Sequence, residues 1–238
     1  MYRQGRKDPP SGLFSSYVAR ENRLVRNQNQ PVASEGFPFI ALFAFITLIF
    51  ALLDWGFLTL VLLALTLFTI YFFRNPERAV PDEPGAVVAP ADGKVIFVGE
   101  VNEERCLKDA AYKISIFMNV FNVHINRVPC AGKVIDKFYR HGAFFNASLD
   151  KAGDQNEQGG LLIETEGGHK ILFVQIAGLV ARRIVTYPVV GDLLRRGARY
   201  GLIRFGSRVD IYLPRDCKLN VKVGDQTVGG ETILGYLS

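Results

Sequence analysis

The sequence contains few of the residues that bind metals or build disulfide frames. Its 238 residues include three cysteines and three histidines. Cys106, Cys130 and Cys217 lie far apart and form no CxxC pair, and the histidines form no HxxxH, HExxH or HxH pattern. These absences argue against a zinc site and a disulfide frame, and they fit reduced thiols in a cytoplasmic domain.

One long segment has no basic residue at all. Between Phe37 and Phe73 the one charged residue is Asp54. As a single helix, at about 1.5 Å per residue, this run would reach about 55 Å, well beyond a hydrocarbon core of roughly 30 Å. We therefore predict a membrane helical hairpin over residues 37–73, with its turn at Asp54-Trp55-Gly56, where a charge, an interfacial aromatic and a flexible glycine meet.

The two arms of this hairpin are short for a full span. Two crossings and a shallow, re-entrant hairpin are therefore both open. The late start and the length of the apolar run argue against a cleavable signal peptide.

Basic residues flank the apolar run on both sides. They outnumber acidic residues before residue 37, and Arg74 and Arg78 directly follow the run. By the positive-inside tendency, both flanks and the domain behind them are expected on the cytoplasmic face of the cell membrane. The formal net charge is only +5. Because it comes largely from these flanks and no nucleic-acid-binding motif is present, anionic lipid is a better partner than RNA or DNA.

The chain divides into a polar, basic tail (1–36), the hairpin (37–73) and one further domain (74–238). That domain reads as short β-branched or aromatic runs broken by glycine, which predicts a mainly β, or β-rich α+β, fold. Residues 182–190 and 192–196 are ambiguous, and a short helix is possible in either. Strands are expected at 94–101, 113–119, 132–139, 160–165, 170–176 and 208–213.

Two segments, 87–95 and 221–235, resemble the turn-rich hairpins of barrel-sandwich folds, which include biotinyl and lipoyl carriers. A carrier needs an exposed lysine at a hairpin tip, within a Met-Lys-Met or Asp-Lys sequence. Neither segment has one. We therefore keep the fold prediction and disfavour the competing function, a membrane-tethered carrier or adaptor.

Few residues are candidates for catalysis. His124 follows the apolar run 114–118 and stands near asparagine and arginine, which suits a general base. On its own, a hydrogen-bonded structural histidine is the commoner explanation, just as Asp92 before glycine is ordinarily a turn residue. His141 and His169 are expected in loops. The Gly-Ser pair at Ser207 is not the GxSxG elbow of hydrolases.

Taken together, five motifs resemble the short prokaryotic type of phosphatidylserine decarboxylase proenzyme, in the order of that family and over residues 28–238. The more widespread form of the family has Ser or Thr in the place of Arg208, so any role for a hydroxyl there is in doubt. The motifs are Phe72-Phe73-Arg74-Asn75-Pro76, Pro90-Ala91-Asp92-Gly93, Asn122-Val123-His124-Ile125-Asn126-Arg127-Val128-Pro129, Asn146-Ala147 with Asn156-Glu157, and Phe205-Gly206-Ser207-Arg208.

The resemblance implies self-cleavage between Gly206 and Ser207. The serine hydroxyl attacks the preceding carbonyl, the resulting ester undergoes β-elimination, and Ser207 ends as a covalent pyruvoyl group. The resemblance also implies that His124 is the base and that Asp92 orients it. The two chains then stay together as a heterodimer, with a higher oligomer possible.

For the reaction, the resemblance implies decarboxylation of phosphatidylserine to phosphatidylethanolamine. The ketone of the pyruvoyl group takes the substrate amine and acts as an electron sink when carbon dioxide leaves, with no metal or dissociable cofactor. A pyruvoyl enzyme for a soluble amino acid is a further alternative, against which the anchor argues.

A lipid substrate implies a site close to the bilayer. Phe144 and Phe145, followed by Asn146, are candidate lipid contacts, and Arg182 or Arg183 could pair with the phosphate or the carboxylate of the substrate. Core phenylalanines and a solvated basic loop explain these residues equally well.

Overall fold

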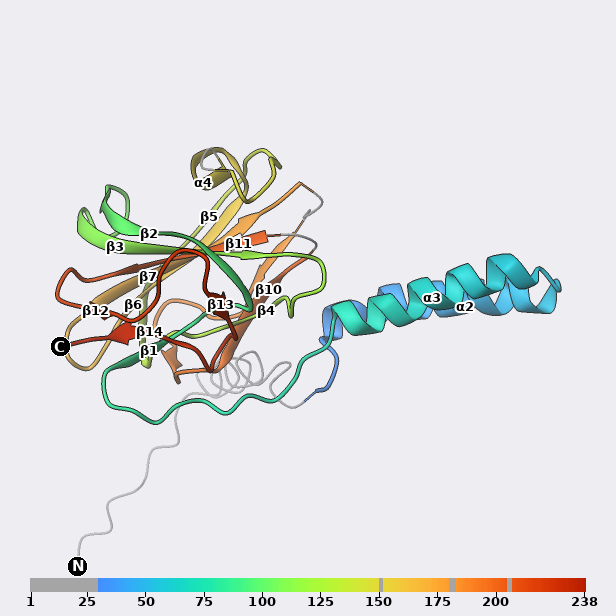
Figure 1. Ribbon diagram of the computed structural model, residues 1–238, viewed down its shortest axis with the longest axis horizontal. Helices are drawn as coiled ribbons and strands as arrows, with labels where there is room; N and C mark the ends of the chain where they lie inside the picture. Colours follow the sequence, from blue (N-terminus) through green and yellow to red (C-terminus); the bar gives the residue numbers. More distant parts are fainter. Residues whose placement is uncertain (1–29, 150–151, 180–182, 205–206) are drawn as a thin grey trace, which may run out of the picture.

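The computed structural model describes residues 30–149, 152–179, 183–204 and 207–238. Two apolar helices project from a β-rich domain (Figure 1). The helical elements are η1 (Ser34–Gly36), α2 (Phe37–Leu52), α3 (Gly56–Phe72) and the single-turn α4 (Ala152–Gln155). The predicted helical hairpin over 37–73 is therefore confirmed.

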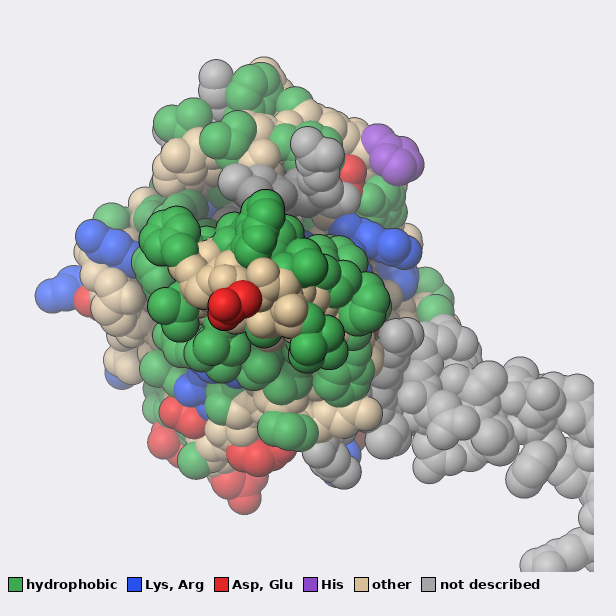
Figure 2. Space-filling model, turned by 90° about the vertical axis from the view of Figure 1, so that its right-hand side faces the viewer, with side chains coloured by type: hydrophobic (Ala, Val, Ile, Leu, Met, Phe, Trp, Pro, Cys, Tyr) green, Lys and Arg blue, Asp and Glu red, His purple; other side chains and the backbone are tan. Residues whose placement is uncertain are grey.

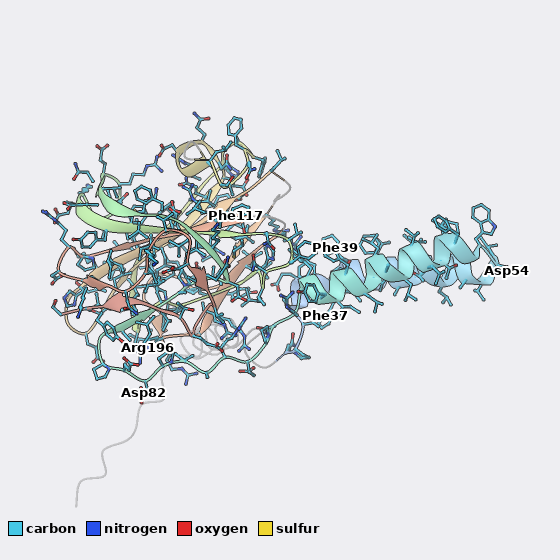
Figure 3. The ribbon with its side chains drawn as sticks, in the orientation of Figure 1. Phe37, Phe39, Asp54, Asp82, Phe117 and Arg196 are labelled. Carbon is cyan, nitrogen blue, oxygen red and sulfur yellow. The ribbon has the colours of Figure 1, made fainter. Side chains whose placement is uncertain are left out.

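The turn of the hairpin differs in detail from the prediction. Asp54 adopts a φ of 61°, in the left-handed region, whereas Gly56 begins α3. A short polar side chain tolerates this conformation, so the turn does not need a glycine there. Figure 3 shows Asp54 at the tip of the hairpin farthest from the domain, with Phe37 and Phe39 at its base.

The two helices pack on each other and expose apolar side chains outward. Their threonine hydroxyls, Thr47 and Thr66, lie 3.3 Å apart across the helix pair. On the outer surface, Leu52 and Phe57 are 78 % and 83 % exposed. Figure 2 looks at the side of the molecule from which the hairpin projects. Hydrophobic side chains cover the hairpin in this view, and Lys and Arg side chains lie beside the hairpin.

By length and composition, one helix in the described part of the chain can cross a membrane. It comprises η1 and α2, Ser34–Leu52, with a mean hydropathy of 2.1 over its best window, and α3 is a shorter apolar helix. Contiguous exposed apolar surface of this kind is the mark of a membrane or protein contact. Full crossing and re-entrant insertion both stay predictions.

Three antiparallel sheets build the domain. The largest has eight strands in the order β13-β2-β3-β11-β7-β6-β5-β9, and the two others have the orders β1-β14-β12 and β4-β10-β8. The mainly β fold class is confirmed. The strands are β1 (Ala86–Val88), β2 (Gly93–Glu103), β3 (Asp109–Met118), β4 (Ile125–Arg127), β5 (Gly132–Arg140), β6 (Gln158–Glu164), β7 (Lys170–Ala177), β8 (Ile184–Thr186), β9 (Leu193–Leu194), β10 (Arg199–Ile203), β11 (Ser207–Leu213), β12 (Lys218–Leu219), β13 (Gln226–Thr227) and β14 (Ile233–Tyr236).

All six predicted strands are present, and the two ambiguous segments contain short strands, β8 and β9. The two barrel-sandwich-like segments lie side by side. Val87 pairs with Gly235 between β1 and β14, and Lys94 pairs with Gln226 between β2 and β13. The ends of the domain are thus joined by backbone hydrogen bonds.

A buried apolar cluster fills the space enclosed by the sheets. Its members alternate along β3 and β11, as Ile114, Ile116 and Met118 do on β3. Because neighbouring residues of a strand point to opposite faces, this alternation places one face of each strand in the core. Val209 and Ile211 of β11 belong to the same cluster.

A second apolar cluster joins the hairpin to the domain. Phe72 and Phe73, at the end of α3, pack with Val123, Ile125 and Leu202. Hydrogen bonds also hold the chain that follows the hairpin against the domain. Arg199 Nε donates to Asn75 Oδ1 (2.5 Å), and Arg127 Nη2 donates to the Pro76 carbonyl (2.6 Å). The link between the hairpin and the domain is therefore a fixed part of the domain.

Candidate active site

Ser207 begins β11, the strand that lies between β3 and β7 in the large sheet. It pairs with Met118 on one side and Ala177 on the other. Its side chain is 0 % exposed, and its Oγ has no hydrogen-bond partner in the described part of the chain. A buried hydroxyl without a partner costs free energy, so its retention at this position calls for a functional reason.

His124 lies just before β4 and is 2 % exposed. Its Nδ1 is 3.0 Å from the Asn122 carbonyl oxygen. Because a carbonyl only accepts, this contact assigns the proton of the neutral ring to Nδ1 and leaves a lone pair on Nε2. Nε2 is itself buried and has no partner among the described residues.

The surroundings of His124 keep the imidazole neutral. Burial is the largest cause that lowers its pKa, to about 4, and the positive charge of Arg74 acts in the same direction, while the Asn122 carbonyl opposes both. A neutral imidazole with a free, dry Nε2 can take a proton from a hydroxyl.

The predicted partnership of Asp92 with His124 is not seen in the structure. Asp92 Oδ2 lies 2.8 Å from Arg78 Nη2, and Oδ1 accepts a hydrogen bond from the Gly229 backbone N–H (2.7 Å). Within the described residues no hydrogen bond connects Asp92 to His124, whose Nδ1 meets the Asn122 carbonyl instead. Asp92 thus joins the start of the domain to its C-terminal segment, and its role as the orienting carboxylate stays a prediction.

The scissile position and one predicted arginine, Gly206 and Arg182, lie outside the described residues. Arg183 is described and exposed, and its carbonyl accepts from the Arg204 backbone N–H (3.3 Å). Burial, followed by the positive charge of Arg183, lowers the pKa of the Arg204 guanidinium. Two cationic side chains therefore lie near each other at the end of β10, directly before the predicted cut.

The other predicted substrate contacts lie in one segment. Phe144 packs partly buried against the main core, whereas Phe145 is 36 % exposed. Asn146 Oδ1 accepts from the backbone and hydroxyl of Ser148. For Phe144 the core explanation therefore has direct support, and contact of Phe145 or Asn146 with lipid stays a prediction.

Asn156 fastens this segment to the strand beside Ser207. Its Nδ2 donates to the carbonyls of Phe145 and Ala177, both at 2.7 Å, and its Oδ1 accepts from the Phe145 N–H at 2.9 Å. Ala177 is the residue paired with Ser207. Motif matching had singled out Asn156 without assigning it a role, and the structure supplies one.

A largely buried polar row runs from Thr186 through Gln175 of β7 to Asn126, near Met118 of β3, and the sequence motifs assign it no role. Gln175 Nε2 donates to Asn126 Oδ1 (2.8 Å), and Thr186 Oγ1 donates to Gln175 Oε1 (2.7 Å). Asn126 Nδ2 is 3.6 Å from the sulfur of Met118, the other strand neighbour of Ser207. A polar residue at 175, inside an otherwise apolar strand, was the available signal.

Among the described residues, no group of three or more His, Cys, Asp or Glu side chains could hold a metal ion. The three cysteines are free thiols.

Comparison with known proteins gives one family. The phosphatidylserine decarboxylase family model matches residues 65–235. The phosphatidylserine decarboxylase proenzyme of Syntrophotalea carbinolica is 65 % identical over 213 residues, which is 90 % of this chain and 100 % of that protein. Proenzymes of the same name from Geotalea uraniireducens and Desulfotalea psychrophila are 55 % and 52 % identical, over 90 % and 87 % of this chain and 100 % and 97 % of theirs. The match over most of the chain shows that this protein belongs to the phosphatidylserine decarboxylase family.

Proposed function

We propose that this protein cleaves itself before Ser207 and then decarboxylates phosphatidylserine to phosphatidylethanolamine at the cytoplasmic face of the cell membrane. The observation that carries the proposal is a pair of buried polar atoms without partners among the described residues, Ser207 Oγ and His124 Nε2. One is a potential nucleophile and the other a potential base, and each lies where water is excluded.

In the cleavage step, His124 Nε2 takes the proton of the Ser207 hydroxyl. The oxygen forms a bond to the carbonyl carbon of residue 206, the bond from that carbon to the nitrogen of residue 207 breaks, and His124 returns the proton to this nitrogen, so that an ester joins the two parts of the chain. β-Elimination, with loss of the Cα proton of residue 207, then breaks the bond from Cβ to the ester oxygen and releases the carboxylate of residue 206. The dehydroalanine left at 207 tautomerises to an imine, which water hydrolyses to the pyruvoyl ketone and ammonia. A neutral imidazole is the form that can accept the hydroxyl proton, and the lowered pKa of His124 keeps it in that form at neutral pH.

Ser207 also suits the pyruvoyl group that the motif resemblance implies. Its Oγ is the orphaned polar atom of the site, and its strand is held on both sides. A pyruvoyl group made there supplies a carbonyl that takes the substrate amine and accepts electrons when carbon dioxide leaves. No metal and no dissociable cofactor are part of the proposal.

The small chain, 207–238, would remain bound after cleavage. It supplies β11 in the middle of the large sheet and β13 at its edge, and β14 pairs with β1 of the large chain. Removing it would break backbone hydrogen bonds to both sides of β11, so the cleaved protein is a heterodimer of its own two chains.

The substrate would reach the site from the bilayer. The hairpin holds the domain at the membrane, and Arg183 with Arg204 supplies positive charge for the phosphate or carboxylate of the headgroup. Phe145, which is 36 % exposed, would contact the lipid.

Denaturing mass spectrometry of the purified protein tests the proposal. The expected result is two chains, 1–206 and 207–238, the smaller one with a pyruvoyl group in place of its N-terminal serine, and one uncut chain for Ser207→Ala. An intact chain in active wild-type protein would overturn self-cleavage and leave the carrier or adaptor function. Carbon dioxide must then be released from phosphatidylserine vesicles and not from free serine, since the reverse would indicate a soluble amino acid as substrate.

A further inference from the structure

The last turn of the hairpin touches the proposed base directly. Phe72, the final residue of α3, is 1 % exposed, and its ring centroid lies 4.2 Å from that of His124, with 33° between the two planes. The phenyl ring therefore covers one side of the imidazole and keeps water from it.

The same end of the hairpin holds the segment that leads to His124. Arg74 Nη2 donates to the Phe121 carbonyl (2.7 Å) and Arg74 Nη1 to the Tyr71 carbonyl (2.8 Å). The Tyr71 hydroxyl donates to the same Phe121 carbonyl at 3.2 Å. The Phe68 ring meets the Phe121 ring edge-on at 6.3 Å. Phe68, Tyr71 and Arg74, at the end of the hairpin, therefore all contact Phe121 in the segment 119–124.

The segment 119–124 in turn fixes the orientation and the tautomer of the His124 imidazole. Inside it, the Asn119 N–H donates to Asn122 Oδ1 and the Phe121 N–H donates to Asn119 Oδ1, each at 2.9 Å. The Asn122 carbonyl, next along the chain from Phe121, then accepts from His124 Nδ1. A continuous series of contacts therefore connects Arg74, through Phe121 and Asn122, to Nδ1 of His124.

We propose that Phe72 and Arg74 are positioning residues for His124, so that the base is competent only while the end of the membrane hairpin is seated on the domain. The inference rests on the proposed function, because it takes His124 as the base. It makes the anchor part of the active site as well as the means of attachment, and it predicts that loosening the hairpin end impairs self-cleavage itself.

The charges around the ring agree with this arrangement. Arg74 is the charged group that acts on His124 among the described residues, and its effect lowers the pKa of the imidazole, as does burial. Phe72 on α3 is apolar, and the stretch 119–123 carries no charged side chain. Removing the phenyl ring would therefore hydrate His124 and raise its pKa toward the ordinary value of about 6.5.

The direct test is the pKa of His124 measured by NMR in the uncut full-length Ser207→Ala chain, with and without Phe72→Ala. This measurement needs no catalysis. We expect the pKa to rise from about 4 toward about 6.5 with Phe72→Ala. An unchanged pKa would overturn the inference while leaving the proposed function intact.

The rate of self-cleavage provides the second readout. With Phe72→Ala, the rate at pH 5 should fall by about tenfold or more relative to its value at pH 8, because the protonated imidazole cannot act as base. Phe72→Trp should restore the wild-type pH profile. If Phe72→Ala does not fold, Phe72→Leu keeps apolar volume without the ring and should move the profile in the same direction.

Phe57→Ala is the matched control, because Phe57 is on the same helix but 83 % exposed at its far end. It should leave the pH profile unchanged. A wild-type profile in the folded Phe72 variants, or an equal shift with Phe57→Ala, would contradict a positioning role. An uncut wild-type chain would instead count against the proposed function, and the NMR titration would still decide the role of Phe72.

Discussion

Arg208 and Asp210, two residues apart on β11, form an ion pair inside the protein. Arg208 Nε lies 2.8 Å from Asp210 Oδ1 and Nη2 lies 2.9 Å from Oδ2, with both side chains at most 3 % exposed. Because side chains alternate along a strand, the pair lies on the face opposite to Ser207. Arg208, directly after Ser207 in the chain, therefore faces away from Ser207 and pairs with Asp210.

Breaking this pair should destabilise the domain. Asp210→Asn leaves the buried Arg208 guanidinium without its anion, which typically costs about 3–5 kcal/mol of unfolding free energy. Pulse proteolysis in increasing urea measures the loss. Asp82→Asn is the matched control: Asp82 is fully exposed and 3.7 Å from Arg196 (Figure 3), so the substitution should leave the unfolding free energy essentially unchanged. If both variants lower the unfolding free energy equally, burial of the Arg208–Asp210 pair does not add to the stability of the domain.

The stability of the protein should depend on pH through His124. Its pKa is about 4 in the folded protein and about 6.5 in an unfolded chain, so between these values the unfolded state binds a proton that the folded state refuses. The contribution is therefore complete above pH 6.5 and is lost as pH falls through 4, with a total of about 3 kcal/mol. Unfolding free energies from pH 7.5 to 4 should show this loss in the uncut Ser207→Ala chain. The additional variant His124→Gln should remove it, and an identical pH slope in both chains would refute the assignment.

Asn156 should be needed for both folding of the 143–149 segment and self-cleavage. Asn156→Ala removes two donated hydrogen bonds and one accepted bond, each worth about 1 kcal/mol. Asn156→Asp should be worse, since a carboxylate would face two carbonyl oxygens. Protease cuts within the segment and the fraction of cleaved chain measure the effects. Asn102→Ala, at an exposed position of β2, should change neither.

The arginines at the end of β10 should act on the substrate and not on cleavage. Arg183→Gln and Arg204→Gln should each raise the KM for phosphatidylserine in vesicles about tenfold or more, because a charge-assisted hydrogen bond contributes about 1.5–3 kcal/mol and about 1.4 kcal/mol is a factor of ten. Self-cleavage should proceed as in the wild type. Arg215→Gln is the control, as its exposed side chain pairs with Glu100 at 2.9 Å. A loss of cleavage equal to the loss of turnover would argue that these arginines support the fold instead.

Most of the fold could be predicted because its signals are local. A long apolar run with one charge near its midpoint specifies the hairpin, and short β-branched or aromatic runs between glycines specify the strands. The conformation of Asp54 was less accessible, since a φ of 61° depends on how two packed helices close their turn. The short strands β8 and β9 were ambiguous because two or three residues carry no periodicity of their own.

The candidate site could be predicted only in part. Ser207 and His124 were found by motif, and the structure adds that both are buried with a free polar atom among the described residues. Phe72 and His124 are far apart in the sequence, and no sequence pattern predicts that their rings are in contact. The hydrogen bonds of Asp92 to Arg78 and Gly229 are likewise long-range contacts. Such pairings arise from strand order and helix docking, which the sequence does not spell out locally.

Hydropathy, β-branched or aromatic runs and motifs are enough to identify the apolar hairpin, the β-rich domain and the family. Each of these signals depends on the order of residue types along the chain. Two relations appear only in the folded protein: the hairpin ends against the proposed base, and Arg208 points away from the site. These relations depend on which surfaces are buried together, and burial is what sets the neutral state of His124 and the free energy of the Arg208–Asp210 pair.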